Sequence, residues 1–513
     1  MMCRLSALAL ALFLVGCATL PEDLPQGVPS KALAPQPGGP LAAAEASLQA
    51  RLDPDQSGFL LLDANAESLH WRLALIDSAT HSLDLQYYVW WGDESGTLIM
   101  KHVVLAADRG VRVRLVVDDL TTMLADSTKV EIRDAAAAVI DAHPNIEVRL
   151  FNPWRARGIA GRILESMLHL ERVNQRMHNK MMIADNRAVI IGGRNLGNEY
   201  FGLAPDYGFR DLDTLGIGPV ARQASEVFDR FWNSELVVPA GYLDFESTGE
   251  DLEEAFSVIT RRLETVDRLS DFPLDRQDWH HLLAKLPTVV AVGSSRVHTD
   301  RLDEDGVTHV MPAAIRELLE GAKREVIIAN AYIIPDAPAI DWLAAEIKRG
   351  IRYRIITNSL ASHDVPAVHA HYKLWRRDLL RAGVELYEMR PDAAVLPLLV
   401  NTPPVEAEFM GLHSKVMVID GERVFIGSMN LDPRSWRINS EMGVVVESVG
   451  LASALQTTLV RDMAPENAWQ VTLASDGILH WVAGDEDLTW QPARHFWQRV
   501  EDIIFMAFPR SLY

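Results

Sequence analysis

Two stretches of this chain place the same residue types at the same spacing. The first contains His178, Lys180, Asp185, Gly192 and Asn195, and the second contains His413, Lys415, Asp420, Gly427 and Asn430. The residues between each Lys and the following Asp are apolar. Imidazole transfers protons or attacks as a nucleophile near neutral pH, while ammonium and amide groups donate to oxyanions. The sequence therefore predicts a duplicated catalytic half-site.

The spacing within each stretch also predicts what the two half-sites do together. Residues two apart in a strand share a face, so each His is expected to project with its Lys into one cavity. If the halves pack face to face, a phosphodiester is the expected ligand. Its oxygens would be bound by Lys180, Asn195, Lys415, Ser428 and Asn430.

We expect the two imidazoles to divide the reaction. One attacks phosphorus and forms a covalent phospho-histidine, while the other protonates the leaving alcohol and later activates the acceptor. This chemistry requires no metal and no other cofactor. The symmetry of the sequence does not assign the two roles to His178 or His413.

Four acidic residues accompany the repeated stretches. Asp185 and Asp420 belong to the catalytic motif but lie in turn sequences, so we expect them to hold hairpins by hydrogen bonds and not to contact phosphate. Asp211 and Glu441 follow the two stretches at similar distances. We predict that they orient the imidazoles by fixing their tautomers, and the alternative is that they are ordinary surface acids.

The elements around these residues alternate between strand and helix in both halves. The predicted strands are 82–89, 111–118, 146–151, 325–332, 351–357 and 384–388, and the predicted helices are 66–75, 98–108, 132–142, 339–349 and 375–382. This rhythm is typical of α/β proteins. We predict two tandem domains, each a mostly parallel helix-covered sheet, packed with pseudo-two-fold symmetry.

The length of 513 residues also favours two cores, because one core stops growing at about 300 residues. The predicted segments are 1–16 (signal peptide), 17–48 (Pro-rich tether), 49–235 (first domain), 236–305 (helical connector) and 306–513 (second domain with a C-terminal extension). The extension carries Trp469, Trp481, Trp490 and Trp497, which we expect to pack as core aromatics.

The N-terminus predicts export. A short apolar run ends in Leu14-Val15-Gly16-Cys17, which resembles the lipobox of bacterial lipoproteins. We predict lipidation of Cys17, which would anchor the protein to a membrane of the bacterial envelope, facing the periplasm. Ala18 favours the outer over the inner membrane. A plain secretory signal with an incidental Cys is the alternative.

The formal net charge of −21 argues against nucleic acid as a partner, because such binding depends on neutralising phosphates. The same acidity discourages broad adhesion to anionic lipid. One segment, 151–164, mixes aromatic, basic and apolar residues. It is interpreted either as a membrane-contacting lip or as an ordinary surface helix.

The duplicated pattern of His-x-Lys, four residues, Asp, then Gly-x-x-Asn resembles the phospholipase D superfamily over residues 66–513. Flanking words, among them Tyr87-Tyr88, Tyr200-Phe201-Gly202 and Leu431-Asp432-Pro433-Arg434-Ser435, are similar to C-type bacterial cardiolipin synthases. The resemblance implies metal-independent transfer of a phosphatidyl group to phosphatidylglycerol, with phosphatidylethanolamine as a candidate second substrate. It also implies that His178 is the nucleophile and His413 the general acid and base.

Two other activities and one inactive role fit the same residues. A phospholipase D-type hydrolase or a nuclease would use the same motif with water as acceptor, and an inactive envelope-binding lipoprotein would keep only the scaffold. One departure from the superfamily pattern is Gly193, where the second copy has Ser428.

Overall fold

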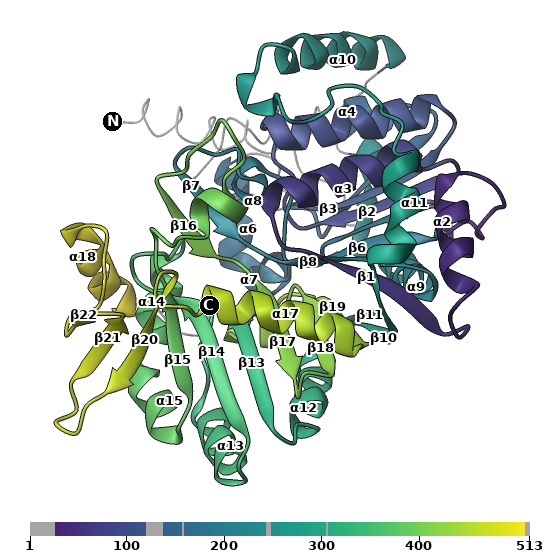
Figure 1. Ribbon diagram of the computed structural model, residues 1–513. Coiled ribbons are helices and arrows are strands. Elements are labelled where there is room, and N and C mark those ends of the chain that lie inside the picture. Colours follow the sequence, from purple (N-terminus) through teal and green to yellow (C-terminus); the bar gives the residue numbers. More distant parts are fainter. Residues whose placement is uncertain (1–25, 120–136, 156–158, 243–247, 304–305, 508–513) are drawn as a thin grey trace, which may run out of the picture.

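The computed structural model describes residues 26–119, 137–155, 159–242, 248–303 and 306–507. The predicted signal peptide, Cys17 and residues 132–136 of the predicted helix 132–142 lie outside these residues, while residues 137–141 are helical as predicted. Figure 1 shows an α/β molecule in which strands of both halves run through the middle and helices cover them. No helix within the described residues has the length and apolar character to span a bilayer.

The first half and the segment after it contain the following elements: α2 (Pro40–Gln49), β1 (Gln56–Leu62), α3 (Asn65–Ser78), β2 (Ser82–Tyr87), α4 (Glu94–Asp108), β3 (Arg112–Asp118), β4 (Ile146–Phe151), α6 (Ile159–Leu168), α7 (Leu170–Asn174), β5 (Met181–Ala184), β6 (Ala188–Gly192), α8 (Asn198–Phe201), β7 (Tyr207–Arg210), β8 (Asp213–Ile217), α9 (Pro219–Trp232), β9 (Val237–Pro239), α10 (Gly249–Leu263), α11 (His280–Val289) and β10 (Ala291–Thr299).

The second half contains β11 (Arg301–Asp303), β12 (Gly306–Thr308), α12 (Met311–Glu320), β13 (Glu325–Asn330), α13 (Ala337–Lys348), β14 (Arg352–Asn358), α14 (Pro366–Tyr372), α15 (Arg376–Ala382), β15 (Glu385–Met389), β16 (Phe409–Leu412), β17 (Lys415–Ile419), β18 (Arg423–Gly427), α16 (Pro433–Arg437), β19 (Met442–Glu447), α17 (Val449–Asp462), β20 (Ala468–Leu473), β21 (Leu479–Ala483), β22 (Glu486–Leu488) and α18 (Phe496–Ile504).

The strand pairings confirm two tandem α/β units but correct the expected direction of the strands. In the first half β2, β3 and β4 are parallel, and in the second half β13, β14 and β15 are parallel. The hairpins β5–β6 and β17–β18 and the strands beyond them pair antiparallel. The sheet is therefore mixed and not mostly parallel, because a strand that follows another through a tight turn must run back along it.

The two halves share one continuous sheet of eighteen strands. Strand β10 pairs antiparallel with β1 of the first half and with β19 of the second half, and so joins the two sheets. The predicted connector 236–305 contains the helices α10 and α11, but β10 was not predicted. Its alternation is weak, and its two partners come from distant parts of the chain.

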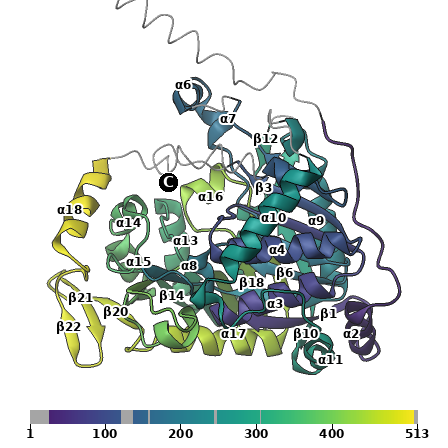
Figure 2. The same ribbon diagram turned by 90° about the horizontal axis from the view of Figure 1, so that it is seen from above.

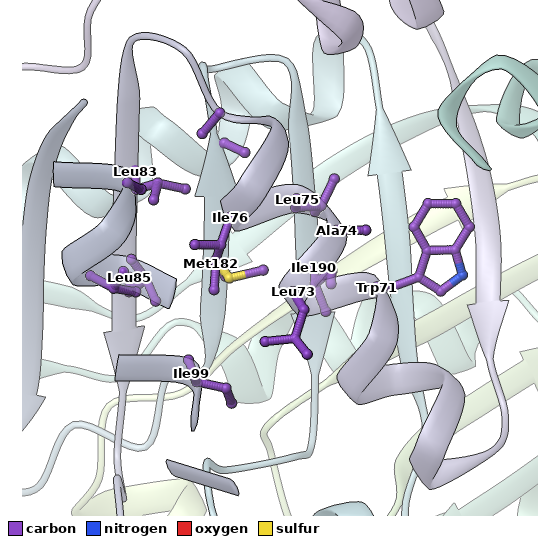
Figure 3. Close-up of a cluster of buried hydrophobic side chains, with 14 of the residues drawn as sticks. Trp71, Leu73, Ala74, Leu75, Ile76, Leu83, Leu85, Ile99, Met182 and Ile190 are labelled. Carbon is purple, nitrogen blue, oxygen red and sulfur yellow. The ribbon is translucent and has the colours of Figure 1, made fainter. Parts of the chain in front are cut away.

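Apolar residues fill both faces of this sheet. Figure 3 shows the cluster on the outer face of the first half, where Leu73 and Ile76 of α3 pack with Leu83 of β2 and with Met182 and Ile190 of the β5–β6 hairpin. A second cluster lies between the halves and contains residues of α9, α17, β5 and β17. Because this central cluster draws on both halves, the halves are fixed against each other where the repeated stretches meet.

The C-terminal tryptophans divide into two pairs. Trp469 and Trp481 are buried in the second half, as predicted. Trp490 and Trp497 are 78% and 66% exposed, so their predicted core packing is wrong. Trp497 lies on the short helix α18, and composition does not reveal which face of such a helix is turned inward, while Trp490 lies in the segment before it.

Candidate active site

The His and Lys of each repeated stretch lie at the start of a central hairpin. His178 and Lys180 occupy the extended segment just before β5, and His413 lies just before β17, whose first residue is Lys415. All four side chains are buried or nearly so. The apolar residues that follow anchor each hairpin strand in the cores, which fixes the position of the polar pair at its end.

The two stretches are joined across the halves by their backbones. The N–H of His178 donates to the carbonyl of Ser440 at 2.9 Å, and the N–H of His413 donates to the carbonyl of Arg210 at 2.8 Å. Ser440 and Arg210 immediately precede Glu441 and Asp211. Each histidine is thereby held beside the acid of the other half, in a pseudo-two-fold arrangement.

The side chains of the histidines and the acids also pair between the two halves. The Nδ1 of His178 lies 2.9 Å from Oε2 of Glu441, and the Nδ1 of His413 lies 2.6 Å from Oδ2 of Asp211. Each Nδ1 thus donates to a carboxyl oxygen of the other half, and Nε2 is the ring atom that is turned away from the acid and left to react. The acids predicted to orient the imidazoles are in contact with them, and each half completes the site of the other.

Hydroxyl groups hold the second of these acids. Ser428 Oγ donates to Glu441 Oε2 at 2.5 Å, and Ser435 Oγ donates to Oε1 at 2.7 Å. Burial raises the pKa of Glu441 to about 8, while Lys180 and the two hydroxyls act against that rise. The hydroxyl of Ser428 is thus engaged by the carboxyl group of Glu441 in this structure, and its predicted contact with phosphate stays a prediction.

The same geometry explains why the first half has glycine at the equivalent position. A Cβ on Gly193 would lie 2.3 Å from Oδ1 of Asp211, far inside van der Waals contact. Asp211 is one methylene shorter than Glu441, and its carboxylate takes the space that a serine would need. Each half thus places a carboxyl group beside the histidine of the other half. The first half does so with Gly193 and Asp211, and the second half does so with Ser428 and Glu441.

The two lysines point back toward their own histidines. Lys180 Nζ donates to the carbonyl of His178 at 2.6 Å and lies 5.0 Å from the ring centre of Tyr88. Lys415 Nζ donates to the carbonyl of His413. Burial lowers the pKa of Lys180 well below its usual value and lowers the pKa of Lys415 to about 8. A phosphate oxyanion between them would raise both pKa values again, because an opposite charge favours the ammonium.

The imidazoles differ in their electrostatic surroundings. Burial and the charge of Lys180 lower the pKa of His178 well below its usual value, and Lys415 and His413 add to this. The pKa of His413 is lowered by burial and Lys415, but Asp211 acts in the opposite direction. The influence of Lys415 and His413 on His178 also shows that the two half-sites lie within electrostatic reach of each other.

The two asparagines have different surroundings. Asn195 accepts from the N–H of Val89 at 3.3 Å and donates to the hydroxyl of Tyr200 at 2.8 Å. Asn430 is buried, and its Oδ1 has no hydrogen-bond partner among the described residues. Asn195 therefore has both amide atoms engaged in the site wall, whereas Oδ1 of Asn430 can still accept a hydrogen bond from a ligand.

The motif aspartates lie at the other end of the hairpins from the histidines. Asp185 accepts from the backbone N–H groups of Thr80, His81 and Ser82, and from the Thr80 hydroxyl. Asp420 accepts equivalently from the N–H groups of Lys323, Arg324 and Glu325. Each carboxylate ties its hairpin to the start of a neighbouring strand, which is the structural role that the turn sequences predict.

We expect Asp185→Ala to lower the free energy of unfolding by about 3 kcal/mol, because several partly buried donors lose their acceptor. Asp420 is more exposed, so Asp420→Ala should cost less, about 1 kcal/mol. Urea unfolding measures both, with Asp55→Ala in an exposed turn as the control. A loss of activity without any loss of stability would contradict this role.

Sequence reasoning named no role for three aromatic residues at the site. Tyr88 contacts the ring of His178 edge-on at 4.9 Å, and Tyr200 and Phe209 lie 5.3 and 4.8 Å from the ring of His413. These rings enclose the imidazoles in an apolar wall. The segments Tyr87-Tyr88 and Tyr200-Phe201-Gly202 could have indicated Tyr88 and Tyr200, because both segments are among those that resemble the cardiolipin synthases.

Taken together, the site offers two buried imidazoles with free Nε2 atoms, two lysines and one available amide. This set suits a reaction that transfers a phosphoryl-type group from one oxygen to another through a histidine. Within the described residues, no three His, Cys, Asp or Glu side chains are grouped so that they could hold a metal ion.

The fold and this paired site define a two-domain enzyme of the phospholipase D type. The family model described as "Cardiolipin synthase, PLD-like domain" matches residues 73–232 and 315–463, and the chain belongs to this family. The family is one of enzymes that act on phospholipids and are associated with bacterial membranes.

Relatives and a solved structure agree with this assignment. The chain is 33% identical to cardiolipin synthase C of Escherichia coli (strain K12) over 459 residues, which cover 87% of this chain and 94% of that protein. It is 27% identical to a cardiolipin synthase of Geobacillus kaustophilus, over 74% of this chain and 61% of that protein. The fold is similar to phosphatidylserine synthase of Haemophilus influenzae, with a TM-score of 0.55, 14% identity, and coverage of 82% and 91% of the two chains.

Proposed function

We propose that this protein is a cardiolipin synthase-type phosphatidyltransferase that works through a covalent phospho-histidine on His178. The observation that carries the proposal is the crossed pairing of His178 with Glu441 and of His413 with Asp211. This pairing supports a single site to which each half contributes one imidazole, with the Nε2 atoms turned away from the acids.

The different surroundings of the imidazoles support the division of roles. His178 has its pKa lowered further, which keeps it neutral and nucleophilic. His413 has Asp211 to stabilise a proton, which suits a general acid. Paired groups whose environments separate their pKa values are a common basis for acid and base roles.

In the first step, His178 Nε2 attacks phosphorus of the donor lipid and the bond from phosphorus to the leaving alcohol breaks. The protonated His413 gives its Nε2 proton to the departing oxygen. Lys180, Lys415 and Asn430 donate to the non-bridging oxygens as their negative charge redistributes. The product is a phosphatidyl-histidine and a free alcohol.

In the second step, neutral His413 takes the proton of the acceptor hydroxyl, whose oxygen attacks phosphorus and displaces His178. With phosphatidylglycerol as acceptor the product is cardiolipin. With water it is phosphatidic acid, the product of the hydrolase alternative. The family relationship to cardiolipin synthases favours the lipid acceptor.

The test is an incubation of the purified protein with phosphatidylglycerol vesicles, with and without phosphatidylethanolamine and in the presence of chelator. Products are identified by mass spectrometry. Cardiolipin is expected, and phosphatidic acid as the only product would overturn the transferase proposal in favour of hydrolysis. Absence of any product and of any phosphoprotein would overturn enzymatic activity itself.

Lys415 gives this activity a pH dependence. Because its pKa is lowered to about 8, the ammonium is present below that pH and is lost as the pH rises through it. We expect kcat/KM to fall between about pH 7.5 and 9, mainly through KM, since a bound phosphate keeps the lysine protonated. Lys415→Arg stays charged, so the fall should be absent from any activity that this variant retains.

The export signal is a second, separate proposal. Lipidation at Cys17 would attach the protein to an envelope membrane on the periplasmic side, with the outer membrane favoured. Metabolic labelling with a radioactive fatty acid tests the attachment, and Cys17→Ser should remove the label. A label that persists in Cys17→Ser would contradict this site of lipidation.

A further inference from the structure

Two helices at the surface turn apolar side chains outward and bury an acidic side chain, the reverse of the arrangement usual in soluble proteins, although Glu501 of α18 is also exposed. On α6, Ile163, Leu164, Met167 and Leu168 are 45%, 57%, 77% and 66% exposed, while Glu165 is buried. On α18, Phe496, Trp497, Ile503 and Ile504 are 69%, 66%, 62% and 56% exposed, while Asp502 is buried. We call these two sets the apolar faces of α6 and α18.

The inward polar residues fix both orientations. Asp502 of α18 pairs with His369 of α14 at 2.7 Å and with Lys373. Glu165 of α6 pairs with Arg172 of α7 and accepts from the N–H of Arg155. Rolling either helix so that its apolar face turned inward would break these contacts, which favours the outward orientation of both faces.

Elements that border the active site separate the two helices. Helix α7 continues from α6 and leads into His178, and Asn174 at its end accepts from Arg434 of α16 at 2.8 Å. On the other side, α18 packs on α14. Asp364, just before α14, accepts from the hydroxyl of Tyr332, whose ring centre lies 5.9 Å from Lys415 Nζ. Figure 2 shows α6 and α7 at the top of the view and α18 at its left side, with α14 and α16 in the region between them.

A bilayer is the occupant that fits both faces at once. A single bound peptide would need one continuous apolar face. Two separate apolar faces on either side of a site can both rest on one extended surface such as a bilayer. The two charged side chains of α6, Arg162 and Glu165, are both buried, so its outward face carries no acid. In a chain of net charge −21, contact with a membrane of anionic lipid must then come from apolar burial and not from charge.

We propose that the apolar faces of α6 and α18 insert into the interface of a phospholipid bilayer and hold the active site over its headgroups. The proposal rests on the proposed function for its choice of a lipid surface. It is independent of any anchor at the N-terminus, because it concerns which side of the folded body meets the membrane.

The direct test uses the full chain with Cys3→Ser and Cys17→Ser, into which single cysteines are placed and labelled with an environment-sensitive fluorophore. Met167→Cys reports on α6, and Trp497→Cys reports on α18. Val449→Cys is the matched control, since Val449 is 67% exposed and α17 lies at the opposite edge in Figure 2. The probe surface is a vesicle of phosphatidylglycerol and phosphatidylethanolamine, with nitroxide-bearing lipid as quencher.

We expect at least twofold quenching at positions 167 and 497 and none at 449. Equal quenching at all three positions, or quenching at 449 alone, would overturn the proposal. A spectral shift at 167 and 497 without vesicles that grows with protein concentration would assign these faces to a second copy of the chain. This readout needs no enzymatic turnover, so it stands even if the proposed activity fails.

A second measurement separates docking from chemistry. The double variants Leu164→Glu/Met167→Glu and Phe496→Glu/Trp497→Glu should lower turnover of vesicle lipid at least tenfold. They should lower turnover of a short-chain, water-soluble phosphatidylglycerol less than twofold. Val449→Glu is the control and should change neither rate. An equal loss on both substrates would overturn the docking role, whereas no product from either substrate with the unmodified protein would count against the proposed function.

Discussion

Replacing His178 by Ala is expected to lower the turnover of phospholipid by about 10⁴-fold or more, because the nucleophile itself is lost. His413→Ala should lower it to a similar extent, since both steps need proton transfer at the leaving or attacking oxygen. Product formation from phosphatidylglycerol measures both, and the Tm of each variant shows whether the fold is kept. Near-normal rates in either variant would contradict a shared site.

A substrate with a nitrophenolate leaving group distinguishes the two histidines. Nitrophenolate departs without a proton, so His413→Ala should still form the phospho-histidine and release one equivalent of nitrophenolate per site. The variant should then stall, because no base activates the acceptor. His178→Ala should give no burst. The reverse pattern would exchange the roles that we assign to the two histidines.

Replacing each acid is expected to affect the same step of the reaction as replacing the histidine of the opposite half. Glu441→Gln should slow the nitrophenolate burst by about 10² to 10⁴-fold, because a glutamine no longer fixes the tautomer of His178. Asp211→Asn should spare the burst and slow turnover of the natural lipid, because it acts on His413. Rapid-mixing measurements of burst and steady-state rates in each variant test this crossed dependence.

The matched control for Glu441 is Glu447→Gln, at the exposed end of the strand β19 that follows Glu441. It should leave both phases unchanged. If Asp211→Asn abolished the burst and Glu441→Gln spared it, each acid would be serving the histidine of its own half. The crossed hydrogen bonds would then not be the functional pairs.

Much of the site could be predicted from the sequence because its residues recur at fixed offsets. The histidines, the lysines and both orienting acids were found this way, and the Asp420-Gly421 turn indicated the hairpin. The crossing of Asp211 and Glu441 could not be predicted, since the two acids occupy equivalent places and only packing between the halves decides which histidine each one meets. The hydrogen bond of Ser428 with Glu441 could not be predicted for the same reason, because it depends on where the Glu441 side chain lies.

The fold was predictable where patterns are local. The alternation of strand and helix predicted both α/β units, and the two buried tryptophans followed from their apolar character. Strand β10 and the outward face of α18 depend on distant partners. The pairing of β10 joins segments from both halves, and the orientation of α18 is set by the contact of Asp502 with His369.

The β10 strand also limits how the enzyme can move. Hydrogen bonds along both of its edges connect the sheets of the two halves, so opening the halves like a hinge would require breaking a main-chain ladder. The ladder therefore favours a fixed separation of His178 and His413, so that, under the proposed function, preorganisation and not domain closure would align the reacting groups.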